Sequence, residues 1–113
     1  MKIINQTKGS ILADKATLAA NFYQRAIGLL GPDHLAAGEA LIIKPCNSVH
    51  TFFMRFPIDV IFVDKQYQVV QTISGLKPFR ISSIHWSSAL VIELPVATIQ
   101  QTCTSSQDTL TIS

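Results

Sequence analysis

The chain has 113 residues, of which 48% are hydrophobic and only 14% charged, and its formal net charge is +2. This length suits one domain, and the apolar content excludes a disordered chain. The sequence holds no basic run of the kind that binds nucleic acid, and no stretch near the roughly 20 apolar residues of a membrane helix. We therefore expect a single domain over residues 1–113, with neither a nucleic-acid nor a membrane partner.

The N-terminal segment is too polar to be the core of a signal peptide, which predicts a cytoplasmic protein unless a targeting segment has been removed. Two cysteines, Cys46 and Cys103, are too few for a disulfide framework. We expect both to be reduced thiols.

In chain order, residues 2–6 and 10–15 are predicted to form two short strands around the turn at Lys8-Gly9. The clearest helix follows, because apolar residues recur at helical spacing at Ala19, Phe22, Tyr23, Ala26 and Leu30. Thr17 is placed to cap the start of this helix, and Gly31-Pro32 ends it.

Beyond Glu39 the pattern is mostly that of strands, at residues 40–43, 58–63, 67–74, 90–94 and 109–112. The run from Ile58 to Val63 is nearly all β-branched or aromatic, which predicts a strand buried on both faces. A short helix is expected from Ala97 to Thr102. About seven short strands and one main helix make a β-rich α+β domain, which we expect to be a small, partly closed barrel or a sandwich.

Cys46 and His50 form the first group of residues with chemical potential. A thiolate and an imidazole at this spacing could both bind Zn or Cu, but structural zinc sites usually show about four ligands, so a metal is not favoured. The same pair could act as nucleophile and base, although no known catalytic motif surrounds it. A buried structural cysteine beside a histidine that binds its own loop is the third interpretation.

Arg25, Arg55, Asp59 and Glu93 form the second group. The two carboxylates lie in apolar strands, where they are costly unless paired, and arginine is the natural partner. The group could form a pocket in which an arginine faces a small anion. Salt bridges that tie the predicted helix to the sheet are the favoured alternative.

Apolar side chains form the third group. Phe52, Phe53, Met54 and Phe56 either line an apolar pocket or belong to the core. The pair His85-Trp86 marks either an exposed contact site or the edge of a core.

Six segments resemble the family known as domain of unknown function 192, in the family's usual order: residues 25–31, 45–54, 55–64, 69–70, 76–80 and 91–95. The resemblance implies a compact β-rich single domain from an uncharacterised family of bacteria and archaea, whose members are either cytoplasmic or exported. The Cys46 and His50 form resembles one branch of that family, which argues against an obligatory catalytic pair.

Two turns depart from the family's pattern. Val96-Ala97 stands where the family tends to have glycine after its Glu-Leu-Pro segment, and Gln107-Asp108 stands where it tends to have Gly-Asp. Glycine permits positive φ, so we expect the backbone to differ at these two turns.

These observations favour a small non-enzymatic binding module with a pocket around the segment from His50 to Asp59. Its candidate ligand-binding residues are Arg25, Cys46, His50, Arg55, Asp59 and Glu93, and its partner would be a small ligand or a protein. Two alternatives stay open: an enzyme with His50 as general base or Cys46 as nucleophile, and a purely structural or interaction domain.

Overall fold

The structure is a computed structural model that describes residues 1–19, 35–51 and 56–113. The described residues form eight strands and one helix: β1 (Ile3–Asn5), β2 (Ser10–Ala13), β3 (Lys15–Ala19), β4 (Glu39–Ile43), β5 (Ile58–Val63), β6 (Val69–Leu76), β7 (Leu90–Pro95), α2 (Thr98–Thr102) and β8 (Leu110–Ile112).

The strands are arranged in two sheets. The larger has the order β3-β4-β7-β5-β6, in which β3 runs parallel to β4 and the other neighbours are antiparallel. The smaller has the order β2-β1-β8 and is antiparallel throughout. Because β3 and β6 are the two ends of the larger sheet, the described strands form a sandwich and no closed barrel. The prediction of a β-rich α+β domain is confirmed, with the sandwich as its form.

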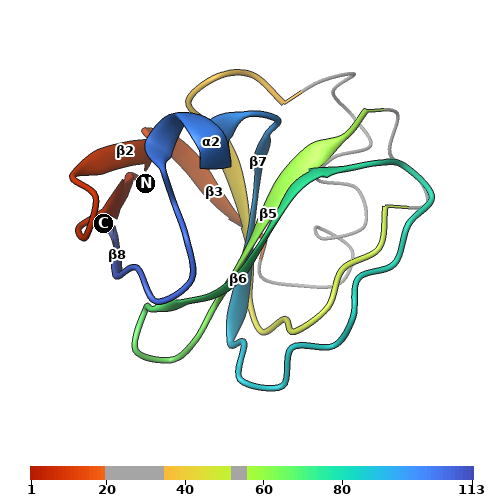
Figure 1. Ribbon diagram of the computed structural model, residues 1–113. Helices are drawn as coiled ribbons and strands as arrows, with labels where there is room; N and C mark the ends of the chain where they lie inside the picture. Colours follow the sequence, from red (N-terminus) through yellow and green to blue (C-terminus); the bar gives the residue numbers. More distant parts are fainter. Residues whose placement is uncertain (20–34, 52–55) are drawn as a thin grey trace.

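The two faces of the large sheet cover two separate cores. On one face, Ile61, Ile92 and Leu94 pack against the small sheet and against Ile99 of α2. On the other face, the core contains Ile58, Val60 and Phe62, together with Val49 from a loop segment. All six residues of β5 are buried, as the continuous apolar run predicted. Figure 1 shows the small sheet and α2 on one side of the large sheet and long loops on the other.

Residues 15–19 differ from the prediction. They form β3, paired in parallel register with all five residues of β4, so Thr17 lies inside a strand and does not cap a helix. Lys15 pairs with Glu39, which lies 24 residues further along the chain. Pairing with so distant a parallel strand leaves no pattern in the local sequence, so the helical spacing of the apolar residues dominated the prediction. The remainder of the predicted main helix, residues 20–30, lies outside the described residues.

The later elements follow the predictions closely. The hairpin of β5 and β6 forms as expected, although β6 starts at Val69 because Tyr67 turns the chain with φ of 62°. The short helix α2 is also present at its predicted place. Ala97 and Gln107 both adopt positive φ, of 75° and 74°, so each stands in the conformation that glycine would take most easily.

Candidate functional site

Two loop segments, residues 44–51 and 77–89, lie side by side on the face of the large sheet that points away from the small sheet. We call them the loop layer. Five backbone hydrogen bonds join them, in which N–H donates to C=O: Cys46 to Ala89 at 3.2 Å, His85 to Asn47 at 2.8 Å, Ser82 to Val49 at 2.9 Å, Thr51 to Arg80 at 2.9 Å and Phe79 to Thr51 at 2.9 Å. The loop layer is therefore a paired structure, although neither segment is a regular strand.

Buried hydroxyl groups fasten this layer from within. The Thr51 side chain is fully buried, and its Oγ1 donates to Lys77 O at 2.6 Å while it accepts from Arg80 N–H at 2.9 Å. Ser82 Oγ accepts from Val49 N–H at 2.9 Å. These bonds satisfy backbone N–H and C=O groups that lie outside the strands of the sheets. They hold the segment from Lys77 to Ser82 in one conformation.

A tight turn follows in the same segment. Ser88 N–H donates to His85 O at 2.8 Å, which closes the turn, and the His85 ring lies on buried Phe62 with the ring centroids 4.2 Å apart. Trp86 is placed at the tip of this anchored turn. It is the chain's one tryptophan, and 82% of it is exposed to solvent.

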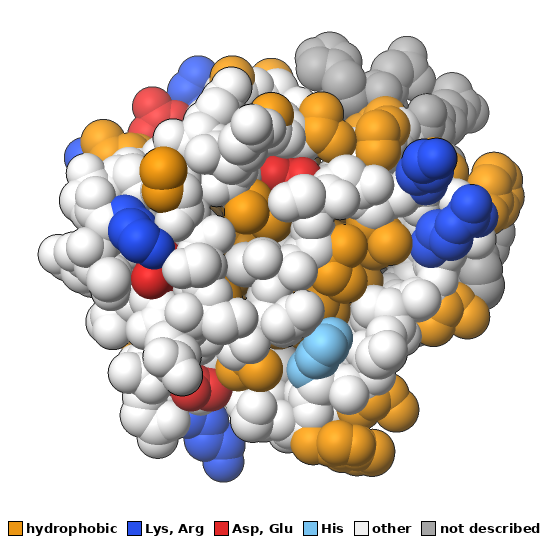
Figure 2. All heavy atoms as spheres, viewed as in Figure 1, with side chains coloured by type: hydrophobic (Ala, Val, Ile, Leu, Met, Phe, Trp, Pro, Cys, Tyr) orange, Lys and Arg blue, Asp and Glu red, His pale blue; other side chains and the backbone are white. Residues whose placement is uncertain are grey.

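Four large apolar side chains of the loop layer face solvent, and we call them the apolar display. They are Phe79 at 68% exposed, Ile81 at 67%, Ile84 at 50% and Trp86 at 82%. Single exposed apolar residues are ordinary on protein surfaces, but four within eight consecutive residues are not. Figure 2 shows hydrophobic side chains gathered at the lower right and right margin of the molecule, over the loops.

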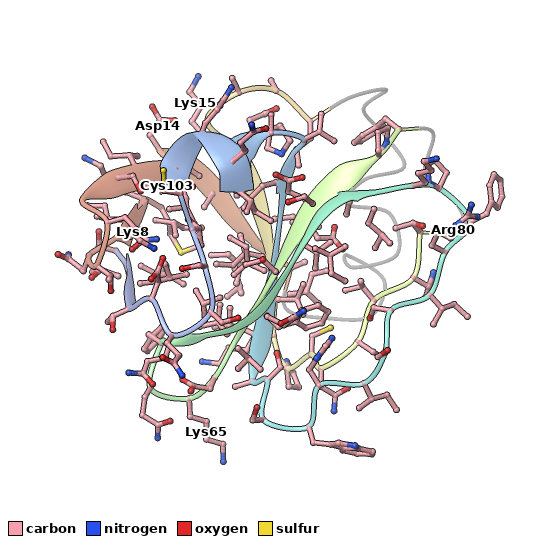
Figure 3. All side chains as sticks on the ribbon, viewed as in Figure 1. Lys8, Asp14, Lys15, Lys65, Arg80 and Cys103 are labelled. Atoms are coloured by element: carbon pink, nitrogen blue, oxygen red, sulfur yellow. The ribbon has the colours of Figure 1, made fainter. Side chains whose placement is uncertain are left out.

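The charged residues within the segment that carries the apolar display have one sign. Lys77 and Arg80 are exposed in the same segment, and no Asp or Glu occurs between Lys65 and Ile92. In Figure 3, Arg80 lies at the right margin, on the opposite side of the view from Lys8, Asp14 and Lys15. The acidic side chains visible in Figure 2 lie toward the left and centre.

Cys46 and His50, both candidates from the sequence, belong to the loop layer. The Cys46 thiol is half-buried and donates to Ser48 O at 2.9 Å. It borders an open hollow of about 300 Å³ lined by Pro45, Cys46, Asn47, Ser48 and Ser88. His50 is exposed and stands opposite Ile81 in an antiparallel bridge, so the two side chains are neighbours on one face. The structure thus places His50 at the margin of the apolar display.

Asp59 is fully buried on β5 and is held by backbone groups. Its Oδ1 accepts from Gly75 N–H and its Oδ2 from Ile99 N–H, both at 2.9 Å. The contact with Gly75 depends on a register shift between β5 and β6 beside Asp59, where Gly75 takes a φ of 65°. This carboxylate therefore joins three elements, β5, β6 and α2.

Glu93 is also buried, but it lies on the other face of the sheet. Asp59 pairs with Leu94, and Glu93 pairs with Val60 on one side and Leu41 on the other. Residues directly opposite each other share a face, so Asp59 faces the small sheet and Glu93 faces the loop layer. The structure does not bring these two carboxylates into one site.

The other predicted site residues, Arg25 and Arg55, lie outside the described residues, as do Phe52, Phe53 and Met54. Within the described part of the chain, no three residues of the types His, Cys, Asp or Glu are grouped so that they could hold a metal ion. In the same part, no helix is both long and apolar enough to cross a membrane.

Sequence reasoning missed a polar cluster at the open end of the small sheet. Lys8 Nζ lies 2.9 Å from Asp108 Oδ2 and also donates to Cys103 O, while Asn5 Nδ2 donates to the same Asp108 oxygen at 2.9 Å. Burial raises the pKa of Asp108, but the hydrogen bonds from Asn5, Ser105 N–H and Lys8, with the charge of Lys8, outweigh it and leave the pKa below its ordinary value. The cluster fastens the C-terminal turn to the first hairpin.

The sequence also missed Phe79, Ile81 and Ile84 as surface residues. The signals that could have found them were the charge-poor stretch from Lys65 to Ile92 and the breaks at Gly75 and Pro78, which remove the segment from the sheet. The sequence left open whether His85-Trp86 is exposed or lies at the edge of a core, and in the structure Trp86 is exposed.

Comparison with known proteins shows the family of this chain. Residues 3–112 match the sequence profile of DUF192, described as "Uncharacterized ACR". A UPF0127 protein of Pyrococcus abyssi is 38% identical over 100 residues, which cover 83% of this chain and 82% of that protein. A UPF0127 protein of Thermococcus sibiricus is 31% identical over 101 residues, covering 86% of this chain but 65% of the relative's length.

A solved structure has the same fold. The crystal structure of a protein of unknown function from Novosphingobium aromaticivorans matches with a TM-score of 0.85, over 99% of this chain and 84% of that one, at 18% sequence identity. At this identity the likeness concerns the fold alone. The family profile and the archaeal relatives agree with the resemblance found in the sequence, and the chain belongs to the DUF192 family.

Proposed function

We propose that this protein is a small non-enzymatic binding module that recognises a partner protein through the apolar display on its loop layer. The observation that carries the proposal is the exposure of Phe79, Ile81, Ile84 and Trp86 within one short segment. Interfaces are enriched in aromatic residues at their centres, and a buried anchor of this kind contributes roughly 1.5–3 kcal/mol before the entropic costs of association.

The anchoring of the loop layer supports the same function. Thr51, Ser82 and His85 fix the backbone that carries the display, so little conformational entropy is lost when a partner binds. A loop that only connected two strands would bury its large apolar side chains or replace them with polar ones. His50, beside Ile81, supplies a polar group at the margin of the same surface.

An enzyme would require a nucleophile, a base and groups that stabilise developing charge to converge on one point. The described candidates are spread over different places: Cys46 in the hollow, His50 on the surface and Asp59 on the far face of the sheet. This distribution favours a binding module over the enzymatic alternative.

The proposal is tested by photo-crosslinking in cells of the source organism. A photoreactive amino acid is introduced at position 79, 84 or 86, and at Ile11 as a control, because Ile11 is 56% exposed on the small sheet. We expect one protein to crosslink from all three display positions and not from position 11. The identified protein is then purified and titrated against wild type, Trp86→Ser and Ile11→Ser.

Trp86→Ser should weaken binding by at least tenfold, as for a hot-spot residue, and Ile11→Ser should leave it unchanged. Crosslinks that form equally at position 11, or a Trp86→Ser variant with wild-type affinity, would contradict the proposal. Circular dichroism of each variant confirms that the fold is kept.

A further inference from the structure

The cations of the loop layer indicate what kind of partner fits the apolar display. Lys77 and Arg80 stand on either side of Phe79 and Pro78, and both are exposed. Among the described residues the one ion pair joins Lys8 to Asp108, on the opposite side of the view in Figure 3. The positive charges beside the display are therefore not neutralised by described carboxylates, and a partner with negative charge would complement them.

The backbone beside the display is suited to an extended peptide. In the bridge between His50 and Ile81, the flanking bonds run from Ser82 N–H to Val49 O and from Thr51 N–H to Arg80 O. This is the non-hydrogen-bonded type of antiparallel pair, in which the N–H and C=O of Ile81 point away from His50, toward the outer edge. A peptide strand can pair with such groups, as in recognition by strand addition.

The same groups argue against a lipid surface. Backbone N–H and C=O groups that enter hydrocarbon without partners cost several kcal/mol each, according to general estimates. Electrostatic attachment to anionic lipid typically takes clusters of about 4–8 basic residues, whereas this segment has Lys77 and Arg80, with Lys44 on the neighbouring segment. The chemistry of the surface therefore favours a polypeptide over a membrane.

We propose that the partner presents an extended acidic segment whose apolar side chains lie on Phe79, Ile81 and Trp86 while its carboxylates face Lys77 and Arg80. This inference rests on the proposed binding function. It adds the sign of the charge, the extended conformation and the alternation of acidic and apolar residues in the segment that is recognised.

The test uses the emission of Trp86, the chain's one tryptophan, as a direct reporter of the display. Three short peptides without tryptophan are titrated at low salt: one in which Glu alternates with Leu and Phe, one with Lys in place of Glu, and one with Ser in place of Glu. We expect the Glu peptide to bind at least tenfold more tightly than the Lys peptide, and its affinity to fall as salt is added.

Charge reversal supplies the matched control. The double variant Lys77→Glu/Arg80→Glu should reverse the order of the Glu and Lys peptides. The variant Lys15→Glu/Lys65→Glu, which changes the net charge equally at sites away from Arg80 in Figure 3, should keep the wild-type order.

The outcomes separate this inference from the proposed function. Equal binding of the Ser, Lys and Glu peptides would overturn the acidic segment while leaving a binding display in place. A change in Trp86 emission with phosphatidylserine vesicles and with none of the peptides would overturn it in favour of a membrane. If neither peptides nor vesicles affect Trp86 and the display positions give no crosslink in cells, both proposals fail.

Discussion

Asp59 and Glu93 lie on adjacent strands of the large sheet, one residue out of register, and their side chains point to opposite faces. Asp59 faces the small sheet and α2, whereas Glu93 faces the loop layer. Two buried carboxylates that look alike in the sequence therefore belong to different halves of the molecule. Asp59 can be tested as part of the scaffold, separately from the surface where we expect a partner to bind.

The first prediction concerns Asp59. Asp59→Asn should lower the free energy of unfolding by about 2–3 kcal/mol, because one backbone N–H, of Gly75 or Ile99, would then face an NH₂ group instead of an oxygen. Urea denaturation measures the change. Asp64→Asn is the matched control, because Asp64 Oδ1 also accepts from two backbone N–H groups but lies in an exposed turn. This substitution should lower the free energy of unfolding by less than about 1 kcal/mol.

If Asp59→Asn costs no more than Asp64→Asn, the carboxylate does not hold β5, β6 and α2 together. The folded variant should also bind the crosslinked partner with wild-type affinity, because Asp59 does not belong to the loop layer. A folded variant that loses the partner would return Asp59 to the binding site.

The second prediction concerns the two turns at Ala97 and Gln107. Ala97 and Gln107 both adopt left-handed conformations, which cost an L-residue with a Cβ about 1–2 kcal/mol. Ala97→Gly and Gln107→Gly should each raise the free energy of unfolding by about 0.5–1 kcal/mol, after the greater entropy of glycine in the unfolded chain is subtracted.

Ala37→Gly serves as the control, because Ala37 is exposed and does not have a positive φ. There glycine should destabilise the fold, so the sign of the effect should differ between position 37 and positions 97 and 107. If glycine changed the free energy of unfolding in the same direction at all three positions, the left-handed backbone at Ala97 and Gln107 would not be the cause of the change there.

The third prediction concerns stability in acid. The pKa of Asp108 is lowered in the folded protein, so its carboxylate contributes stability that is fully present above its pKa in the unfolded chain. That contribution is lost as the pH falls through the lower pKa of the folded state, which places the loss below about pH 4. In Asp108→Asn, the free energy of unfolding should fall less steeply over this range than in wild type.

Chemical denaturation at a series of pH values measures this slope. Lys8→Met removes the charge that faces Asp108 and should also flatten the curve, but by less, because Asn5 and Ser105 still donate to the carboxylate. An unchanged slope in Asp108→Asn would contradict the assignment.

The fourth prediction concerns the anchoring of the loop layer. Thr51→Val keeps the size of the side chain but removes the hydroxyl that bonds Lys77 O and Arg80 N–H. The free energy of unfolding should fall by about 1–3 kcal/mol, and amide exchange should rise over residues 77–82. Thr51→Ser, which keeps the hydroxyl, should stay close to wild type. Similar amide exchange in the two variants would mean that the hydroxyl does not order this segment.

The sequence predicted the elements whose signal is local. The apolar run from Ile58 to Val63, the hairpin that follows it and the short helix near Thr98 all appear where the pattern places them. β3 was missed because its parallel partner β4 is distant in the chain, and pairing with it overrides the helical spacing around Ala19.

The surface and the polar cluster could not be predicted in the same way. Whether Trp86 is buried or exposed depends on where the turn of residues 85–88 sits above Phe62, which is a property of the whole fold. The bond between Lys8 and Asp108 joins residues 100 positions apart, and single-sequence reasoning has no means to pair them. His50 was predicted as part of a pocket around the segment from His50 to Asp59, and in the structure it stands opposite the exposed residue Ile81.

The central claim is that a partner protein covers the apolar display, and quenching of Trp86 fluorescence by acrylamide measures this most directly. In the protein alone, an indole that is 82% exposed should be quenched almost as readily as free tryptophan. In complex with the crosslinked partner, in a variant of that partner without tryptophan, quenching should fall several-fold as the indole is buried. Quenching that stays unchanged in the fully formed complex would contradict the account, because the partner would then bind elsewhere on the molecule.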